Sequence, residues 1–570
     1  MGVNKKWIIA EAEEKKVLHL QKELNIHPVL CRVLVSRGIE TFDQAKGFFR
    51  PDPGMLHDPF LMKGMGEAVS RITSALEKKE KIRIYGDYDV DGTTAVAVMY
   101  NFLSRFIDPE LISYYIPNRY TEGYGLSSRG IAHALQAGCN LMIVLDCGIR
   151  SVELVDEANQ LGIDVIICDH HLPGETLPPA VAILNPKQTH CPYPFKELSG
   201  CGIGFKLITA LARAWDIPDQ DLPYTFLDLV AASIASDIVP ITGENRVLAY
   251  YGLRKVNEHP SAAIRILKEV SGIRGKMNIA NLVFFIGPKI NAAGRMNDAA
   301  KVVKLFTEHN PEHIYKIAQE LNADNKERIT FDKNTTMEAL AMMEDNAWQN
   351  KKSIVLHHEQ WHKGVVGIVA SRILEHHYKP TIILTTSNGK ITGSARSVHG
   401  FDIHSAISAC ADLLEHYGGH QFAAGVTMPV ENLARFRETF ERVVSESIAP
   451  ESLSPFLHID AELPLSGIHL SLLRIIEQFE PCGPMNMAPV FVSRGVRDNG
   501  NSRIVKQEHL QLHLQQNGTS MKGIAFRMAE WLPYLQSGNA IDIAYHIERN
   551  EWNGNVAAEL RVIDIKKSIA

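Results

Sequence analysis

The segment Gly86–Gly92, with the sequence GDYDVDG, places three aspartates at alternate positions: Asp87, Asp89 and Asp91. An apolar run that predicts a strand precedes this segment, and an apolar run that predicts a helix follows it. Closely spaced carboxylates in a turn are suited to binding a divalent cation. An EF-hand calcium loop is excluded, because that loop needs a preceding helix and a glutamate at its twelfth position, where this chain has Val98.

Two further acidic groups follow predicted strands in the same way. Asp146 ends the run LMIVLD, and Asp169 ends the run DVIICD and is followed by His170 and His171. The carboxyl ends of parallel strands meet at one edge of a sheet, so we expect these side chains to lie near the first three aspartates. Carboxylates crowded in this way repel one another and require a compensating cation. Carboxylates with imidazoles suit Mn²⁺ or Mg²⁺, and bridging carboxylates suit a pair of such ions.

Each of these residues by itself has a simpler interpretation. Aspartate often caps the N-terminus of a helix, and an aspartate can also simply end a strand. A single histidine is more often structural than a ligand. The recurrence of acidic groups at the ends of successive strands, together with two adjacent histidines, favours a metal centre over a set of unrelated caps.

The elements that position these residues alternate between strands and helices. Strands are predicted at 81–86, 141–146 and 164–169 and helices at 93–103 and 151–162, which indicates an α/β fold with a mostly parallel sheet. A polar helical stretch with one break at Pro311 is expected to connect this region to a second α/β region, and short β-rich runs near the end predict a small barrel of the oligonucleotide-binding (OB) type. The predicted domains are a helical arm (1–60), a catalytic α/β domain (61–298), a connecting helix (299–350), a second α/β domain (351–450) and an OB-like barrel (455–570).

Composition excludes several classes of protein. The 570 residues are 45% hydrophobic and 22% charged, as in a soluble globular protein, and no apolar run is long enough to span a bilayer. The net charge of −6 excludes a uniformly basic coat for nucleic acid, although not a local basic groove. None of the eight cysteines forms a C-x-x-C pair, so we expect a reduced, cytoplasmic protein. The glycines of SGCGIGFK (199–206) lack the spacing of a dinucleotide site and predict a tight packing turn.

Several of these motifs resemble a known family. GDYDVDG, DCG (146–148) and DHH (169–171) look like signatures of the DHH phosphoesterase superfamily. Further segments are similar to those of its RecJ branch, the bacterial 5′→3′ exonucleases of single-stranded DNA, and the β-rich tail fits the OB domain of that branch. These segments are PNRYTEGYGL (117–126), DIVP (237–240), GPKINAAGRM (287–296), EQWHKGVVGIVASRI (359–373), GSARS (393–397) and GGHQFAAG (418–425).

The resemblance implies roles for individual residues. The metal ligands for two Mn²⁺ or Mg²⁺ ions would be Asp87, Asp89, Asp91, Asp146, His170 and Asp237, with Asp146 as the bridge. Asp146, His170 and His171 would form the catalytic group, with His171 assisting the attacking water or the phosphate, while Asp169 would support its loop. The pocket for the 5′-terminal phosphate would consist of Arg295, Ser394 and Arg396, and the DHHA1 substrate-binding motif would contribute Gly418, Gly419 and His420. Arg119 would be a further substrate- or phosphate-binding residue.

The function that the resemblance implies is degradation of single-stranded DNA to 5′-mononucleotides in DNA repair and recombination. A single-stranded-DNA-binding protein and a RecQ-like helicase would be its partners, and a monomer is expected. Two alternatives remain: a DHH phosphodiesterase acting on short oligoribonucleotides or cyclic dinucleotides, and a non-catalytic DNA-binding scaffold. The long chain and the complete set of Asp and His ligands favour the exonuclease. Tyr124 and Trp361 are each either base-stacking or core residues.

Overall fold

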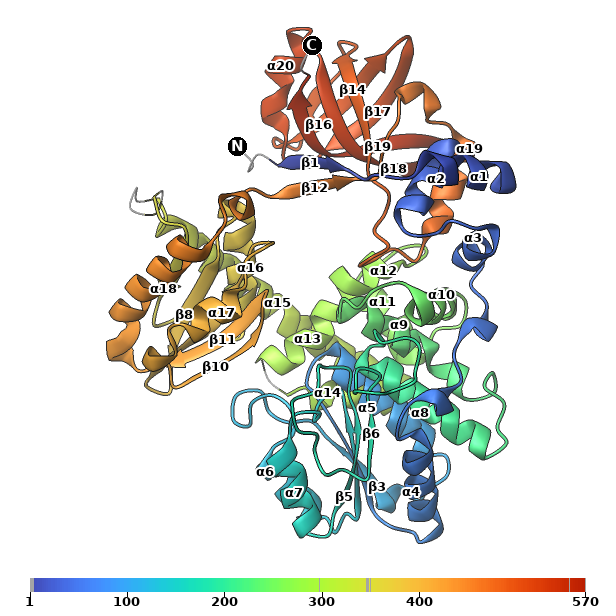
Figure 1. The fold of residues 1–570 in the computed structure, drawn as a ribbon, viewed down its shortest axis with the longest axis vertical. Coiled ribbons are helices and arrows are strands. Elements are labelled where there is room, and N and C mark those ends of the chain that lie inside the picture. Colours follow the sequence, from blue (N-terminus) through green and yellow to red (C-terminus); the bar gives the residue numbers. More distant parts are fainter. Residues whose placement is uncertain (1–4, 297, 345–347, 349, 553, 569–570) are drawn as a thin grey trace. The chain divides into compact units, whose positions relative to one another are not determined.

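The computed structural model describes residues 5–568 except 297, 345–347, 349 and 553 (Figure 1). The chain forms two compact units. The first consists of Met1–Ile8, Ala292–Asp298 and Glu320–Leu457, and the second of Ile9–Asn291, Ala299–Gln319 and His458–Ala570. Within the described ranges, no helix combines the length and the apolar character that a membrane span requires.

A five-stranded parallel sheet forms the centre of the second unit, with the strand order β3-β2-β4-β5-β6. The chain runs from β2 to β3 on one side and returns to β4 on the other, so the order reverses between β2 and β4. Ligands of such sheets bind at the carboxyl ends of the strands beside this point. The strands are β2 (Ile82–Gly86), β3 (Ile112–Tyr115), β4 (Leu141–Leu145), β5 (Asp164–Cys168) and β6 (Ala182–Leu184).

Helices lie on both faces of this sheet (Figure 1), which is why every residue of β2 and β4 is buried. The strands and helices predicted for this region are present. The first helix begins at Val90, earlier than predicted, because the Asp89 side chain caps its N-terminus. The covering helices are α4 (Met65–Glu77), α5 (Val90–Leu103), α6 (Ser128–Gln136), α7 (Val152–Gln160) and α8 (Gly200–Ala214).

A helical region continues the second unit after the sheet. Helix α9 is buried along nearly its whole length and packs against α5 and α10. Between α12 and α13, residues Leu282–Ile286 form a π-helical turn, η5, which is a wider turn than that of an α-helix. The helices are α9 (Leu227–Ser236), α10 (Gly243–Glu258), α11 (Ala262–Val270), α12 (Ile279–Asn281), α13 (Gly287–Met296), whose residues from Ala292 onward belong to the first unit, and α14 (Ala300–Thr307).

The first unit contains the second α/β region, whose mixed sheet has the strand order β10-β11-β9-β8-β7. Phe436 and Phe440 of α18 are fully buried in its core. The long helix α15 leads into this sheet, and Pro311 is its first residue, a position where proline is well tolerated. The elements are α15 (Pro311–Ala341), β7 (Ile354–His357), α16 (Val366–His377), β8 (Thr381–Ser387), β9 (Lys390–Arg396), α17 (Ile403–Ser408), β10 (His416–His420), β11 (Ala423–Met428) and α18 (Leu433–Ser447).

The C-terminal part of the second unit is the predicted small β-barrel. Its seven strands have the order β13-β14-β18-β19-β17-β16-β15, and a further pairing of β14 with β16 closes the sheet. Helices of the N-terminal arm contribute Leu20 and Leu30 to the same hydrophobic core. The elements are α1 (Glu14–Leu24), α2 (Pro28–Ser36), α3 (Phe42–Phe49), β13 (Ala461–Glu462), α19 (Leu470–Ile476), β14 (Phe491–Asp498), β15 (Arg503–Val505), β16 (His509–Gln516), β17 (Thr519–Ala525), α20 (Leu532–Gln536), β18 (Ile541–Trp552) and β19 (Asn555–Lys567); outside the barrel, β1 (Lys6–Ile9) pairs with β12 (Phe456–Ile459).

Candidate metal centre

The acidic residues of the second unit gather at the carboxyl edge of its parallel sheet. Asp87 follows β2, and Asp89 accepts a hydrogen bond of 3.0 Å from the Gly92 amide at the start of α5. Asp146 follows β4 in a left-handed conformation with φ of 60°, which aspartate tolerates better than most residues. Asp237 caps the C-terminus of α9.

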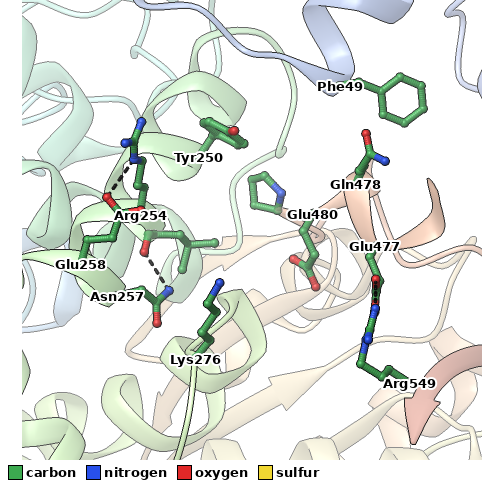
Figure 2. A pocket seen from close by; sticks show the side chains of 12 residues that line it. Phe49, Tyr250, Arg254, Asn257, Glu258, Lys276, Glu477, Gln478, Glu480 and Arg549 are labelled. Carbon is green, nitrogen blue, oxygen red and sulfur yellow. Dashed lines mark hydrogen bonds and ion pairs between the residues drawn. The ribbon is translucent and has the colours of Figure 1, made fainter. Parts of the chain in front are cut away.

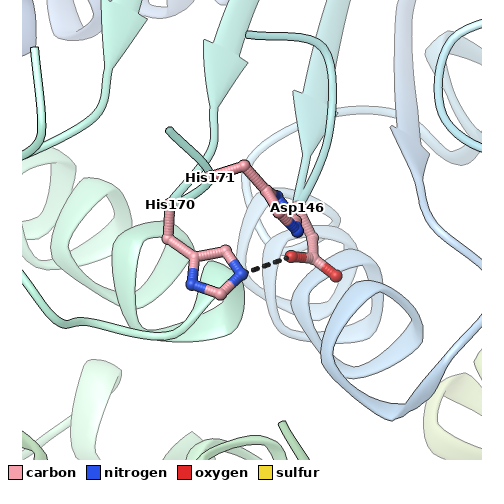
Figure 3. A group of neighbouring side chains, drawn as sticks. All are labelled: Asp146, His170 and His171. Carbon is pink, nitrogen blue, oxygen red and sulfur yellow. Dashed lines mark ion pairs between the residues drawn. The ribbon is translucent and has the colours of Figure 1, made fainter. Parts of the chain in front are cut away.

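His170 lies at the centre of this group, after β5. Its Nε2 atom is 3.3 Å from Asp146 Oδ1, 3.5 Å from Asp237 Oδ2 and 3.9 Å from Asp91 Oδ2. Figure 3 shows the His170 ring pointing at the Asp146 carboxylate from the neighbouring strand end. Ligand atoms of three sets lie within 4.8 Å of one another and could hold a metal ion: Asp146, His170 and His171; Asp91, His170 and Asp237; and Asp87, Asp89 and Asp146.

The electrostatics of the group indicate that a cation belongs there. Four buried atoms have no hydrogen-bond partner among the described residues, namely Asp87 Oδ1, Asp146 Oδ1, His170 Nε2 and Asp237 Oδ2. Burial, followed by the charge of neighbouring aspartates, raises the pKa of Asp87, Asp89 and Asp146 above the ordinary value and that of Asp237 to about 9. Burial also lowers the pKa of His170. A divalent ion would satisfy the unpartnered atoms and remove this repulsion.

Asp91 is held in place by the N-terminus of α8. Its carboxylate accepts hydrogen bonds from the amides of Gly200 (2.6 Å) and Cys201 (2.7 Å) and from the Ser233 hydroxyl (2.6 Å). A Cβ atom on Gly200 would lie 2.5 Å from Asp146 Oδ1, so only glycine fits there. The sequence predicted a packing turn here. The segment instead forms the first turns of α8, with Ser199 as its N-cap, and the available signal was this serine followed by small residues, since the free amides of a helix N-terminus attract an anion.

Asp169 and His171 form a hydrogen-bonded pair of side chains. Asp169 accepts hydrogen bonds from the Ile149 amide (2.9 Å) and from the His171 ring at Nδ1 (2.7 Å). Burial opposes ionisation of Asp169, but these hydrogen bonds outweigh it and lower its pKa. The same pair raises the pKa of His171 despite burial. Nε2 of His171 lies 3.2 Å from the hydroxyl of Tyr124.

Tyr124 and Trp361, for which the sequence left base stacking and core packing open, differ in exposure. Tyr124 is 56% exposed beside His171, whereas Trp361 is 4% exposed in the core of the first unit and donates from its indole nitrogen to Glu338. The guanidinium of Arg119 lies 5.0 Å from the centroid of the Tyr88 ring, within the GDYDVDG loop. Arg119, one of the predicted phosphate-binding residues, therefore lies beside the GDYDVDG loop.

The other predicted phosphate-binding residues lie in the first unit, and all of them except Arg295 are on strands β9 and β10 of its sheet. Arg396 and His420 occupy one row across β9, β11 and β10, because each is paired with Ala423. Gly418 and Ser394 share another row, through Gly425. Within each row, the position on β9 and the position on β10 are about 10 Å apart, because β11 lies between these two strands. Nη1 of Arg396 donates to the Ser394 hydroxyl (2.7 Å), and Nη1 of Arg295 donates to the Gly364 carbonyl (3.1 Å). Gly419 has a φ of 146°, a backbone conformation that favours glycine.

A hollow of about 900 Å³ lies elsewhere in the second unit and includes none of the predicted site residues (Figure 2). Its arginines are paired within its own lining, Arg254 with Glu258 at 2.9 Å and Arg549 with Glu477 at 2.6 Å. We therefore assign this hollow no part in the chemistry.

Comparison with known proteins gave matches along most of the chain. Family models match at 81–234 (DHH family, N-terminal domain), 350–446 (DHHA1 domain) and 459–564 (RecJ OB domain). The single-stranded-DNA-specific exonuclease RecJ of Bacillus subtilis is 34% identical over 563 residues, which cover 98% of this chain and 70% of the relative. That of Escherichia coli is 31% identical, with 94% and 96% covered. The crystal structure of RecJ with Mn²⁺ from Thermus thermophilus has a TM-score of 0.86 at 27% identity, with 99% of this chain and 80% of that chain covered.

Proposed function

This chain belongs to the RecJ family of DHH phosphoesterases, and from that membership we propose that it is a metal-dependent exonuclease of single-stranded DNA. Relatives that are named single-stranded-DNA-specific exonucleases match nearly the whole chain. The observation that best supports the proposal is the set of four buried, unpartnered ligand atoms at the carboxyl edge of the sheet. In this proposal the products are 5′-mononucleotides, released from the 5′ end in the course of DNA repair and recombination.

The residues at the sheet edge fit a pair of Mn²⁺ or Mg²⁺ ions. Their oxygen and imidazole donors suit these metals, and solved relatives were crystallised with Mn²⁺ and with Mg²⁺. When bound, such ions lower the pKa of a water molecule towards neutrality and neutralise phosphate charge. The central position of Asp146 between two of the ligand groups suits a bridging role. The proposed ligands are Asp87, Asp89, Asp91, Asp146, His170 and Asp237.

The chain's own residues would fix the geometry of the reaction. The α8 amides and Ser233 orient the Asp91 carboxylate, so that its position does not depend on the substrate. Asp169 accepts from Nδ1 of His171 and thereby fixes that ring, whose Nε2 faces the site and can exchange a proton there. Arg119, stacked on Tyr88, is placed to donate to a phosphate oxygen.

Direction of attack would depend on recognition of the terminal phosphate. We assign that recognition to Arg295, Ser394 and Arg396, with Gly418, Gly419 and His420 approaching the strand along β10. The support is the shared strand register of these residues and the contact of both arginines with the Gly364–Gly367 segment, where Nη2 of Arg396 would lie 3.0 Å from a Cβ on Gly367. Guanidinium groups suit phosphate because they donate two parallel hydrogen bonds.

Assembly and location are part of the same proposal. By analogy with its family, the protein would act as a cytoplasmic monomer beside a single-stranded-DNA-binding protein and a RecQ-like helicase. A pull-down of each purified partner by the purified chain, with and without DNA, tests the association. Sedimentation analysis tests the monomer.

A time course on one single-stranded oligonucleotide, labelled separately at each end, tests the activity. With Mn²⁺ or Mg²⁺ we expect immediate release of a 5′-labelled mononucleotide, gradual loss of the 3′-labelled strand, and no reaction with chelator or blunt duplex. The Asp146→Asn variant should lose on the order of a thousandfold in rate, while Asp156→Asn on the exposed face of α7 should match wild type. Rapid attack on a three-nucleotide RNA alone would favour the oligoribonuclease alternative, and binding without cleavage would favour the scaffold.

A further inference from the structure

Two phenylalanines on the π-helical turn η5 are exposed to an unusual degree. Phe284 is 71% and Phe285 46% exposed, whereas Leu282 and Ile286 of the same turn are fully buried. The turn packs against α9 through its buried side and presents both rings on the other. Exposed adjacent aromatic rings are costly in water, and π-helical turns occur often at functional sites.

The helical run from Leu282 to Asn291 contacts two of the segments that carry the proposed metal ligands, the end of α9 before Asp237 and the start of α5. At one point it is packed so closely against the end of α9 that a Cβ on Gly287 would lie 2.7 Å from the Ser236 hydroxyl, and Ser236 directly precedes Asp237. One helical turn later, Oδ1 of Asn291 accepts a hydrogen bond of 3.2 Å from the Val90 amide, between Asp89 and Asp91. Phe284 is three residues before Gly287, so it lies about 5 Å along the helix axis from the Gly287–Ser236 contact.

The Asp237 loop adds a further exposed apolar residue, Ile238, and the backbone of this residue has an uncommon conformation. Ile238 has φ of 60° and is 66% exposed. A β-branched residue in the left-handed region is a genuine outlier, and such outliers concentrate at ligand-binding sites. The backbone of Phe285 is held in place as well, because its carbonyl accepts a hydrogen bond of 3.0 Å from the buried Lys289 ammonium.

We propose that Phe284 and Phe285, which we call the aromatic shelf, stack on nucleobases of the single strand next to the metal centre, with Phe284 as the principal contact. This inference rests on the proposed function and adds a base-contacting element to it. Nucleobases are the occupant that fits, because every base offers a flat π-face and stacking is independent of sequence. The shelf adjoins the loops that would bind the scissile phosphate, so a base one or two nucleotides away can reach it.

Steady-state kinetics on a 5′-phosphorylated single-stranded oligonucleotide, in Mn²⁺, test the shelf. Phe284→Ala and Phe284→Leu are expected to raise KM about five- to hundredfold, and Phe284→Trp to stay within about twofold of wild type. Leucine retains the apolar contact and loses the ring, so it separates stacking from simple burial. Phe60→Ala is the matched control, because Phe60 is 44% exposed on the surface of the N-terminal region.

A series of oligonucleotides with one abasic residue at successive positions from the 5′ end supplies the second readout. At the stacked position the abasic residue should raise KM for wild type and leave KM for Phe284→Ala unchanged. A KM within about twofold of wild type for Phe284→Ala and Phe284→Leu, or equal abasic penalties in wild type and variant at every position, would overturn the shelf. If wild type itself releases no nucleotide, the proposed function fails, and the shelf fails with it.

Discussion

At the scale of single residues, the candidate metal centre brings together buried carboxylates whose charges would repel one another. His170 Nε2 lies within 4 Å of three of them, and none of these three contacts has the geometry of a hydrogen bond. The neighbouring glycine is equally constrained, because the Gly200 backbone approaches the Asp146 carboxylate more closely than any side chain permits. Two predictions belong to this scale.

The first concerns Gly200. Gly200→Ala would place a methyl group 2.5 Å from Asp146 Oδ1 and 2.7 Å from its Cγ, so Asp146 must move. We expect at least a tenfold loss of nuclease rate and a higher Mn²⁺ requirement, since displacing a ligand by about 1 Å can cost about a hundredfold. Gly66→Ala in α4 is the control, because nothing lies within 4 Å of the added methyl and helix propensity favours alanine. Equal rates for the two variants would contradict the close contact.

The second concerns pH in the absence of metal. The pKa of Asp237 is raised to about 9 in the fold and is about 3.9 when unfolded, so between these values the folded state binds the extra proton. Stability therefore falls as pH rises through this window. We expect the melting temperature in chelator to fall from pH 5 to 8 more steeply for wild type than for Asp237→Asn. Mn²⁺ should raise the wild-type value at pH 8 more than that of the variant; identical pH profiles would contradict the assignment.

At the scale of elements, the GDYDVDG loop (86–92) is held by hydrogen bonds with residues outside it as well as by those within it. The N-terminus of α8 binds Asp91, and α13 binds the first amide of α5 through Asn291. Helix N-termini leave their amides unpaired, so such contacts satisfy the backbone and orient the carboxylates together. The loop thus depends on two helices that follow it by more than a hundred residues.

Asn291→Ala tests this dependence. Loss of a helix cap costs about 0.5–2 kcal/mol, which corresponds to about a two- to thirtyfold increase in the Mn²⁺ concentration for half-maximal activity. Asn291→Asp retains the acceptor and should restore most of the affinity. Asn101→Ala removes a comparable hydrogen bond from the same helix α5, to the Phe306 carbonyl at 2.9 Å, and should leave the metal requirement unchanged. Titration of Mn²⁺ against the nuclease rate of the three variants measures this concentration for each of them.

At the scale of the whole molecule, the second unit combines the catalytic sheet, the N-terminal arm and the barrel. Arg246 of α10 is central to this arrangement. Its guanidinium donates to the carbonyls of Phe48 (2.8 Å) in the arm and of Phe479, Glu480 and Pro481 (3.1–3.2 Å) before the barrel. Burial lowers its pKa to about 10, and charge is retained at neutral pH. A single side chain therefore joins three parts of the sequence.

Arg246→Met should destabilise the second unit by about 2–5 kcal/mol, because it leaves several buried carbonyls without a donor. Arg254→Met, further along the same helix α10, removes an exposed pair with Glu258 and should lower stability much less, because solvent screens exposed ion pairs. Thermal melting compares the two. Limited proteolysis with mass spectrometry should locate new cleavage at residues 479–487 in Arg246→Met, and an unchanged digestion pattern would contradict this role.

The sequence by itself determined the local features: aspartates directly after apolar strands, the α/β alternation, the barrel and the family resemblance. These follow from backbone periodicity and residue type, which are properties of neighbouring positions, and the structure and the comparisons confirm the fold class. Only tertiary structure decided which distant groups complete the site. The partners of Asp91 come 109 to 142 residues later, and the exposure of Phe284 and the burial of Trp361 depend on what packs against each ring. Burial and hydrogen-bond partners are set by the packing of whole elements, which no short sequence pattern encodes.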